Sequence, residues 1–274
     1  WIFLDLNKNM DLMKNSLPAL MVVLTLIACE TSKESTTVEA PPSNPPVEGF
    51  DAMGSDSLAM AWADACMSAM GGREKWDQLS VVSWNFFGAR DLIWEKPTGR
   101  VRIDFPGDSS IYLFNINTME GRVWQKGEEL TQPDSLKKYL ARAKSIWIND
   151  SYWLVMPFKL KDSGVTLKYS RPDTTMKGAK TEVLELTFSE VGVTPNNKYE
   201  VFIDKSDSLV KQWSYCREAR QDSASAIWPW DNYQSYNGLL LSTDRSDNRG
   251  PKNVKVYEQV PDAVFESFEV PELN

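Results

Sequence analysis

The stretch KYEVFIDKSDSLVKQW, residues 198–213, decides the fold class. Tyr199, Val201 and Ile203 alternate with polar or outward positions, which is the pattern of an antiparallel strand with one buried face. A Lys-Ser-Asp-Ser turn at 205–208 follows, and the chain then returns through a second apolar run that ends at Trp213. The stretch therefore predicts a β-hairpin with one face in a core.

The same alternation recurs along the chain, at Val101, Ile103 and Phe105, at Leu184, Leu186 and Phe188, and at Val254 and Val256. Turn signals such as Tyr236-Asn237-Gly238 separate these runs. Helices are expected at Ser57–Met70, at Pro133–Trp147 and, as a short one, at Asp150–Met156. In the first of them, the residues expected on one buried face are Leu58, Trp62, Ala65, Cys66 and Ala69.

These elements predict an α+β fold with roughly ten strands and two to four short helices. The expected architecture is one large curved antiparallel sheet with helices packed on one face. No internal repeat is visible, so residues 50–274 are expected to form a single β-rich domain.

The first 28 residues predict a lipoprotein signal peptide preceded by upstream residues. Met10 and Met13 are both plausible starts, and Lys14 precedes a short apolar run from Leu17 to Ala28. The run ends in Leu-Ile-Ala-Cys, the pattern of a bacterial lipobox, so Cys29 is the predicted lipidation site. An ordinary signal peptide with an incidental cysteine is the alternative.

A polar spacer follows the predicted lipid anchor. Residues 29–49 contain four Pro and many Ser, Thr and Glu, with few apolar side chains to bury. Such a composition predicts a disordered linker between a membrane anchor and a folded domain.

The composition excludes several classes of function. The net charge is -8 and no basic run is present, which argues against nucleic acid as a partner. The chain has no His, so the commonest general base and metal ligand are missing. We find no nucleophile-elbow, P-loop, Cys-x-x-Cys or dinucleotide motif. The sequence therefore predicts neither an enzyme, nor a metal site, nor a cofactor.

Three segments resemble outer-membrane lipoprotein-sorting and related carrier proteins, the LolA/LolB-like family, which includes many uncharacterised Gram-negative envelope lipoproteins. They are Met70–Leu79 (MGGREKWDQL), Lys198–Trp213 and Gly238–Asp244 (GLLLSTD). Asn149–Phe158 (NDSYWLVMPF) is similar to a segment of uncharacterised envelope lipoproteins of the same general kind. The resemblance covers most of residues 50–274. It implies a LolA-like half-open β-barrel, with helices on its concave face and an apolar cavity for acyl chains. A tethered chain departs from a soluble carrier, so a receptor-like binding role fits the resemblance better than a shuttle.

Aromatic residues are the main candidates for contact with such a ligand. The predicted ligand-binding residues are Trp84, Trp94, Trp124, Trp153, Met156, Phe158, Trp213 and Trp228. The alternative is that these side chains fill the core between sheet and helices. Two Trp that flank a Pro, as in Trp228-Pro229-Trp230, are hard to bury together, so at least one is expected at a groove or an edge.

Two cysteines and two acidic turns remain. Cys66 and Cys216 are candidates for a disulfide in an oxidising compartment, and two separate buried thiols are the alternative. The turns at 204–207 and 244–250 do not match the spacing of calcium ligands, so we interpret them as solvated turns.

Three hypotheses of function follow. The first is a lipid-anchored envelope protein, most simply of the outer membrane, that binds a lipid or another apolar ligand in a half-barrel cavity. The second is a structural or protein-interaction lipoprotein with a filled barrel. The third is a hydrolase with two carboxylates that face each other in a cleft. The predicted partners are the membrane, through the anchor, and a lipid or lipoprotein acyl chain.

Overall fold

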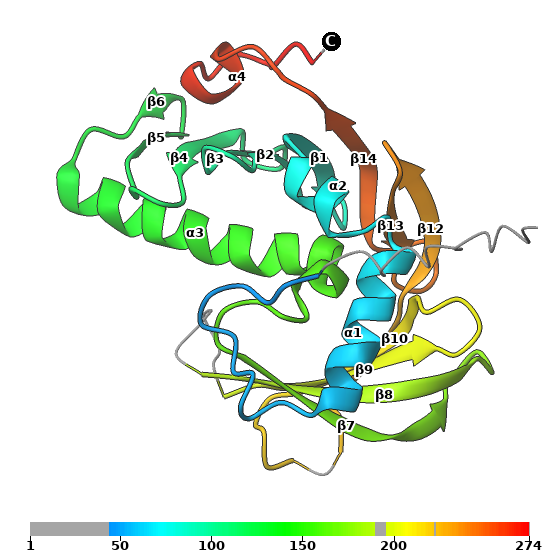
Figure 1. Cartoon of the computed structure of the whole chain (residues 1–274). Coiled ribbons are helices and arrows are strands. Elements are labelled where there is room, and N and C mark those ends of the chain that lie inside the picture. The colour runs from blue at the N-terminus through cyan, green and yellow to red at the C-terminus, as the bar shows by residue number, and fades with distance from the viewer. Residues whose placement is uncertain (1–43, 190–195, 222, 274) are drawn as a thin grey trace, which may run out of the picture. The chain divides into compact units, whose positions relative to one another are not determined.

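The computed structural model describes residues 44–189, 196–221 and 223–273. They belong to one compact unit, Ala40–Asn274. Within it, two antiparallel sheets lie on opposite sides of one long helix (Figure 1). The predicted Cys29, the signal peptide and most of the predicted linker lie outside the described residues.

The larger sheet has seven strands in the order β14-β1-β2-β3-β4-β5-β6. Apart from β14, neighbours in the chain are neighbours in the sheet, as expected for short antiparallel turns. The strands are β1 (Val81–Phe86), β2 (Arg90–Glu95), β3 (Arg100–Phe105), β4 (Ser110–Asn115), β5 (Gly121–Gln125), β6 (Glu128–Glu129) and β14 (Pro251–Tyr257).

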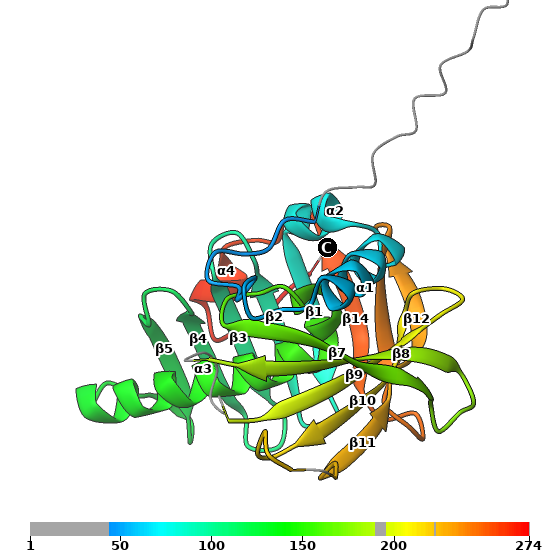
Figure 2. The ribbon, with the colours of Figure 1, turned by 60° about the horizontal axis from the view of Figure 1, so that its bottom comes forward.

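The second sheet has five strands in the order β11-β10-β9-β8-β7 (Figure 2), and a two-stranded sheet pairs β12 with β13. Asn237 and Gly238 both have positive φ in the turn between β12 and β13, as the Asn-Gly pair predicts. These strands are β7 (Val165–Thr174), β8 (Lys180–Phe188), β9 (Lys198–Asp204), β10 (Val210–Cys216), β11 (Ala226–Pro229), β12 (Asp231–Tyr236) and β13 (Leu239–Asp244).

Helix α3 (Pro133–Val155) lies between the two larger sheets (Figure 1). On one side, Trp147 packs edge-on against Trp94 of β2, with 5.2 Å between ring centroids. On the other side, Trp153 contacts Trp213 of β10 at 4.8 Å. One helix thus supplies a partner to the apolar face of each sheet, and buried side chains from both sheets form one core cluster with it.

A buried ion pair fixes the C-terminal half of α3 to the seven-stranded sheet. Asp150 is fully buried and accepts two hydrogen bonds from Arg90 of β2, at 2.6 and 2.7 Å. Burial raises the pKa of Asp150, and the bonds from Arg90 act against that rise. The pair therefore sets the register of the helix on the sheet, because either charge alone would be costly at this depth.

The remaining helices of the described part are short. They are α1 (Ser57–Ala69), α2 (Arg73–Gln78), the 3-10 helix η1 (Met156–Lys159) and α4 (Ala263–Glu266). Helix α1 ends before Gly71 and Gly72, which have φ of 113° and 89°. Its predicted buried face is wrong in part, since Leu58 is 48% exposed. Cys66 is buried as predicted, and the other buried positions of the helix are Ala59, Ala63 and Met67, because the helix is apolar on more than one side.

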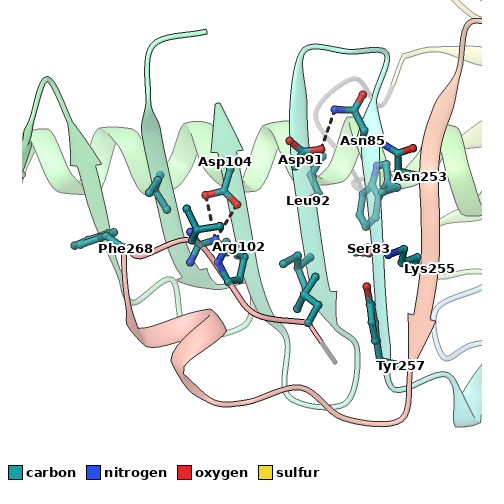
Figure 3. Close-up of a pocket in the computed structure, with 16 residues that line it drawn as sticks. Ser83, Asn85, Asp91, Leu92, Arg102, Asp104, Asn253, Lys255, Tyr257 and Phe268 are labelled. Carbon is teal, nitrogen blue, oxygen red and sulfur yellow. Dashed lines mark hydrogen bonds and ion pairs between the residues drawn. The ribbon is translucent and has the colours of Figure 1, made fainter. Parts of the chain in front are cut away.

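Helix α4 and the residues after it cross the face of the seven-stranded sheet that points away from α3 (Figures 1 and 3). We call that face the outer face, and we call residues 262–273, which include α4, the strap. Arg102 of β3 is 1% exposed and donates to the strap carbonyls of Val264, Ser267 and Glu269, at 3.2, 2.7 and 2.8 Å. Its Nε also bonds Asp104. One buried guanidinium thus satisfies three carbonyls that follow the start of α4.

A second buried arginine joins the two-stranded sheet to the end of α3. Arg245 is fully buried, stacks on Trp230 at 3.4 Å and donates to Ser242 Oγ and to the carbonyl of Trp153. Burial lowers the pKa of Arg245 to about 9. Trp230 is therefore a core residue, whereas Trp228 is half-buried on β11, an edge strand.

The predicted α+β class with antiparallel sheets and few helices is confirmed, and the described sheets do not close into a barrel. The strands divide between sheets because α3 separates them. The helices expected at Pro133–Trp147 and Asp150–Met156 are continuous as α3 and η1. Within the described residues, no helix combines the length and apolar character needed to cross a membrane.

We expect Arg102→Met to destabilise the domain and to release the strap. The loss leaves Asp104 without its buried partner and three carbonyls without a donor, which costs about 3–5 kcal/mol. Urea unfolding measures the loss, and limited proteolysis within residues 262–273 measures the release.

Arg122→Met is the matched control, since Arg122 also bonds the strap, at Glu266 O, but is 48% exposed. It should cost about 1 kcal/mol or less. Equal losses in the two variants would show that Arg102 has no special role in holding the strap.

Candidate functional site

A pocket of about 420 Å3 lies on the outer face, between the sheet and the strap (Figure 3). Ligand pockets usually measure about 300–1,000 Å3, so its size suits a small molecule. We call it the outer-face pocket. Its lining residues are Ser83, Trp84, Asn85, Asp91, Leu92, Ile93, Arg102, Asp104, Ile111, Asn253, Lys255, Tyr257, Phe268, Val270, Pro271 and Leu273.

The strand register arranges the polar groups of the pocket in two rows across the sheet. Ser83 pairs with Lys255 on one side and Ile93 on the other, and Ile93 pairs with Arg102. The row two residues along contains Asn85, Asp91 and Asp104, again directly opposite one another. One row thus carries both cations of the pocket and the next carries both carboxylates.

A β-bulge on β14 adds Asn253 to the lining. The register of β1 against β14 shifts between Ser83 and Asn85, and Asn253 has a φ of 51°. Asparagine tolerates this left-handed conformation better than most residues. Bulges often redirect a side chain beside a functional site, and Figure 3 shows Asn253 beside Asn85 at one end of the pocket.

Three hydrogen-bond donors of the pocket have no partner within the described residues: the Ser83 hydroxyl, the Lys255 ammonium and the Tyr257 hydroxyl. Ser83 is 8% exposed, so its hydroxyl is largely withdrawn from bulk water. Lys255 is exposed at the rim. A ligand with an acceptor group would satisfy donors that the described residues leave free.

The two carboxylates are not equivalent. Asp91 accepts from Asn85 Nδ2 at 2.9 Å, whereas both oxygens of Asp104 accept from Arg102 Nε, at 3.1 and 2.8 Å. Burial raises the pKa of Asp104, the bonds from Arg102 oppose the rise, and the charge of Asp91 adds to it. Because Asp104 is committed to Arg102, this pair is poorly arranged for the proton transfers of a glycoside hydrolase.

Most residues predicted to line an inner cavity lie in the core. Trp84, Trp94, Met156, Phe158 and Trp213 are at most 7% exposed and belong to one buried cluster. Phe158 stacks on Trp76, which in turn meets Trp94. These five side chains are packed as the alternative of a filled core expects, and Trp84 is also among the residues that line the outer-face pocket.

Trp153, Trp213 and Trp228 do come together, in a second group on the side of the five-stranded sheet that faces α3. We call this group the inner aromatic cluster; its members are Phe87, Tyr152, Trp153, Phe188, Tyr199, Trp213, Tyr215 and Trp228. All except Trp213 are half-buried. Among the residues that the structure describes, the Tyr152 hydroxyl and the Trp213 indole N–H have no hydrogen-bond partner, and both are buried. The cluster therefore remains a candidate contact surface beside the outer-face pocket.

Trp124, the last predicted ligand residue, lies on the outer face. Its ring contacts Phe268 of the strap, with 5.5 Å between centroids, and Arg122 stacks over the same Phe268. Trp124 thus supports the wall of the outer-face pocket without lining it.

Sequence reasoning missed the polar residues of the pocket. In Arg100–Phe105 the alternation that predicts a buried apolar face also places Arg100, Arg102 and Asp104 on the other face. In the sequence that face looks solvent-exposed, because no nearby residue indicates that another segment covers it. The covering segment is the strap, 160 or more residues further along the chain, to which Arg102 is bonded at Val264 and Glu269. The sequence feature that could have indicated the pocket is the row of charged residues on the outward face of this strand.

The cysteine and metal predictions concern other parts of the fold. Cys66 and Cys216 are free thiols and both are buried, as in the alternative of two separate thiols. Burial raises the pKa of Cys66 to about 12. Among the described residues, no three His, Cys, Asp or Glu side chains gather in a way that would hold a metal ion.

No protein-family model and no curated protein matches the sequence. Solved structures give low-level similarity. A DUF1329 family protein from Desulfovibrio piger is 14% identical, with a TM-score of 0.43, over 76% of this chain and 97% of that one. A putative outer membrane lipoprotein-sorting protein domain from Vibrio parahaemolyticus is 10% identical, with a TM-score of 0.38, over 74% and 97%.

A LolA superfamily protein from Nitrosomonas europaea is 11% identical, with a TM-score of 0.33, over 76% of this chain and 96% of that one. The Vibrio and Nitrosomonas structures carry names of the group that the sequence resembles. At TM-scores below 0.5 they carry no argument about the ligand or the site, which rest on the residues described above.

We expect Asp104 to make the stability of the domain depend on pH. Its pKa is raised in the folded state, so the fold favours the protonated carboxyl. The stability that this group contributes is therefore complete below its unfolded pKa and is lost as pH rises through the folded value. Asp104→Asn removes this titration. The free energy of unfolding of the natural protein, minus that of the variant, should fall between pH 4 and pH 7 in urea titrations; a rise would contradict the assignment.

Proposed function

We propose that this chain is a lipid-anchored protein of the Gram-negative envelope that binds an amphipathic ligand without chemical conversion. The outer-face pocket is the proposed binding site. The proposed ligand is a lipid or another apolar molecule, as the sequence predicts, and its proposed site is the outer face instead of the aromatic interior. The outer membrane is the proposed location, with Cys29 as the acylated residue.

One observation carries the proposal: the outer-face pocket has an apolar side and a polar side. Ile93 and Ile111 on the sheet and Val270, Pro271 and Leu273 on the strap supply the apolar side. The hydroxyl, amide and charged groups lie on β1, β2, β3 and β14 (Figure 3). A mostly apolar cleft with a few convergent polar groups is the usual form of a small-molecule site.

A protein-interaction role is the second candidate, and the packing of the predicted cavity residues in the core favours it over a carrier with an inner cavity. Trp228 lies half-buried on the edge strand β11, whereas Trp230 is 1% exposed, so the two Trp that flank Pro229 do not form one exposed surface for a protein partner. We therefore place ligand binding at the outer-face pocket first.

We expect Ile111→Asp to weaken binding of the neutral apolar probe N-phenyl-1-naphthylamine by about tenfold or more, because a charge on the apolar wall opposes burial of the probe. Fluorescence titration of the purified protein measures the affinity.

Ile227→Asp is the matched control, since Ile227 is an isoleucine that is 44% exposed on β11. It should leave the probe affinity unchanged. If Trp228→Leu removes binding while Ile111→Asp does not, the ligand site is the inner aromatic cluster and the proposal for the outer-face pocket is wrong.

We expect Cys29→Ser to abolish incorporation of labelled palmitate and to release the protein from the membrane fraction, since the thiol forms the thioether to the lipid and several acyl chains are needed for stable attachment. Cys216→Ser is the control and should retain both the label and the membrane association. Membrane attachment that survives Cys29→Ser would contradict the proposed anchor.

A further inference from the structure

The outer-face pocket is balanced in charge but its charges are separated. Lys255 and Arg102 occupy one cross-strand row, and Asp91 and Asp104 occupy the next. Positions two residues apart along a strand lie roughly 6.6 Å apart. A ligand that spans the two rows therefore meets positive charge at one position and negative charge at the other.

The chain neutralises one charge of each row by itself. Arg102 and Asp104 bind each other, and the remaining N–H groups of Arg102 point at strap carbonyls. Lys255 has no partner within the described residues, and Asp91 is bonded through one oxygen to the Asn85 amide, which carries no charge. Lys255 and Asp91 are thus the two charges of the pocket without an ionic partner in the described chain.

The positive position is more than a surface lysine. Ser83 lies directly opposite Lys255 on β1, is 8% exposed, and presents a hydroxyl that no described residue bonds. Tyr257 follows on β14, two residues further along the same face. Figure 3 shows Ser83, Lys255 and Tyr257 on one side of the pocket, away from Asp104 and Arg102. An ammonium and two hydroxyls match the several acceptor oxygens of an anionic group such as a phosphate.

Apolar surface adjoins both charged positions. Ile93 separates Ser83 from Arg102 in the first row, and Ile111 pairs with Asp104 in the second. Val270 of the strap is 88% exposed beside the pocket. A ligand held by its charged head at Lys255 and Asp91 can therefore lay an apolar chain along the sheet and against the strap.

We propose that the outer-face pocket selects a zwitterionic amphiphile, with its anionic group at Lys255, Ser83 and Tyr257, its cationic group at Asp91, and its apolar chain beneath the strap. The inference rests on the proposed function and names the class of ligand for the same site. A purely cationic ligand would leave Lys255 unpaired, and a purely anionic one would face Asp91. Neither uses both unpaired charges.

Three probes with the same ten-carbon chain test this: decylphosphocholine (zwitterionic), decyltrimethylammonium (cationic) and decyl phosphate (anionic), each below its micelle-forming concentration. Calorimetric titration of the purified protein measures each affinity. The zwitterionic probe should bind at least about fivefold more tightly than either single-charge probe, the factor expected from one partly exposed ion pair. Phosphocholine without the chain should bind far more weakly.

Two charge-removing variants should show opposite patterns. Lys255→Gln should weaken the zwitterionic and anionic probes by about fivefold and leave the cationic probe unchanged or tighter. Asp91→Asn should weaken the zwitterionic and cationic probes and spare the anionic one. Lys137→Gln, at an exposed lysine of α3 outside the pocket, is the matched control and should change none of them.

The result distinguishes the class of ligand from the existence of the site. Equal affinity for the three ten-carbon probes would contradict a zwitterionic ligand. The same holds if Lys255→Gln and Asp91→Asn change no affinity while Ile111→Asp weakens every probe. In both cases the pocket remains as an apolar binding site. Equal affinity for phosphocholine and decylphosphocholine overturns the amphiphile. Probe binding that ignores Ile111→Asp overturns the proposed function together with this inference.

Discussion

The burial of two sheet faces against one helix governs this fold. An antiparallel sheet with one apolar face must cover that face, and α3 covers part of two such faces at once through Trp147 and Trp153 on different sides. The fully buried Asp150, paired with Arg90, fixes how far the helix is turned against the seven-stranded sheet. Both sheets pack on this helix, so the contacts of each sheet with α3 set where the strands of that sheet lie.

This arrangement explains why so many aromatic residues serve the core. A helix that packs on two sheets leaves wide gaps beside it, and Trp, Tyr and Phe fill them with large rings that meet edge to face. Rings used in this way are not available to line a cavity. The outer-face pocket lies where the core ends, on the outer face of the seven-stranded sheet, whose apolar residues Val81 and Ile93 are covered separately by Val264 and Phe265 of α4.

The strap connects the stability of the domain with the proposed site. Arg102 holds the strap through three carbonyls and also keeps Asp104 paired, so the wall of the pocket and its charge pattern depend on the same guanidinium. If the proposed lipid anchor is present, it would supply the membrane attachment of a protein whose proposed ligand is amphipathic. The two carboxylates that face the pocket, Asp91 and Asp104, are bonded to Asn85 and Arg102.

The sequence alone determined the secondary structure and the class of fold, because period-two alternation and turn residues act over a few positions. Val101 and Ile103, Leu184 and Leu186, and Val201 and Ile203 all lie in the core, as their spacing predicts. Tertiary structure decided which strands share a sheet, which side of the apolar α1 is buried, and whether each Trp meets a ligand or another ring. It also decided the site: Ser83, Asp91 and Lys255 have no local motif, and only cross-strand register and a distant strap bring them together around one pocket. Local chemistry sets what each segment can form, whereas long-range packing selects which surfaces remain open.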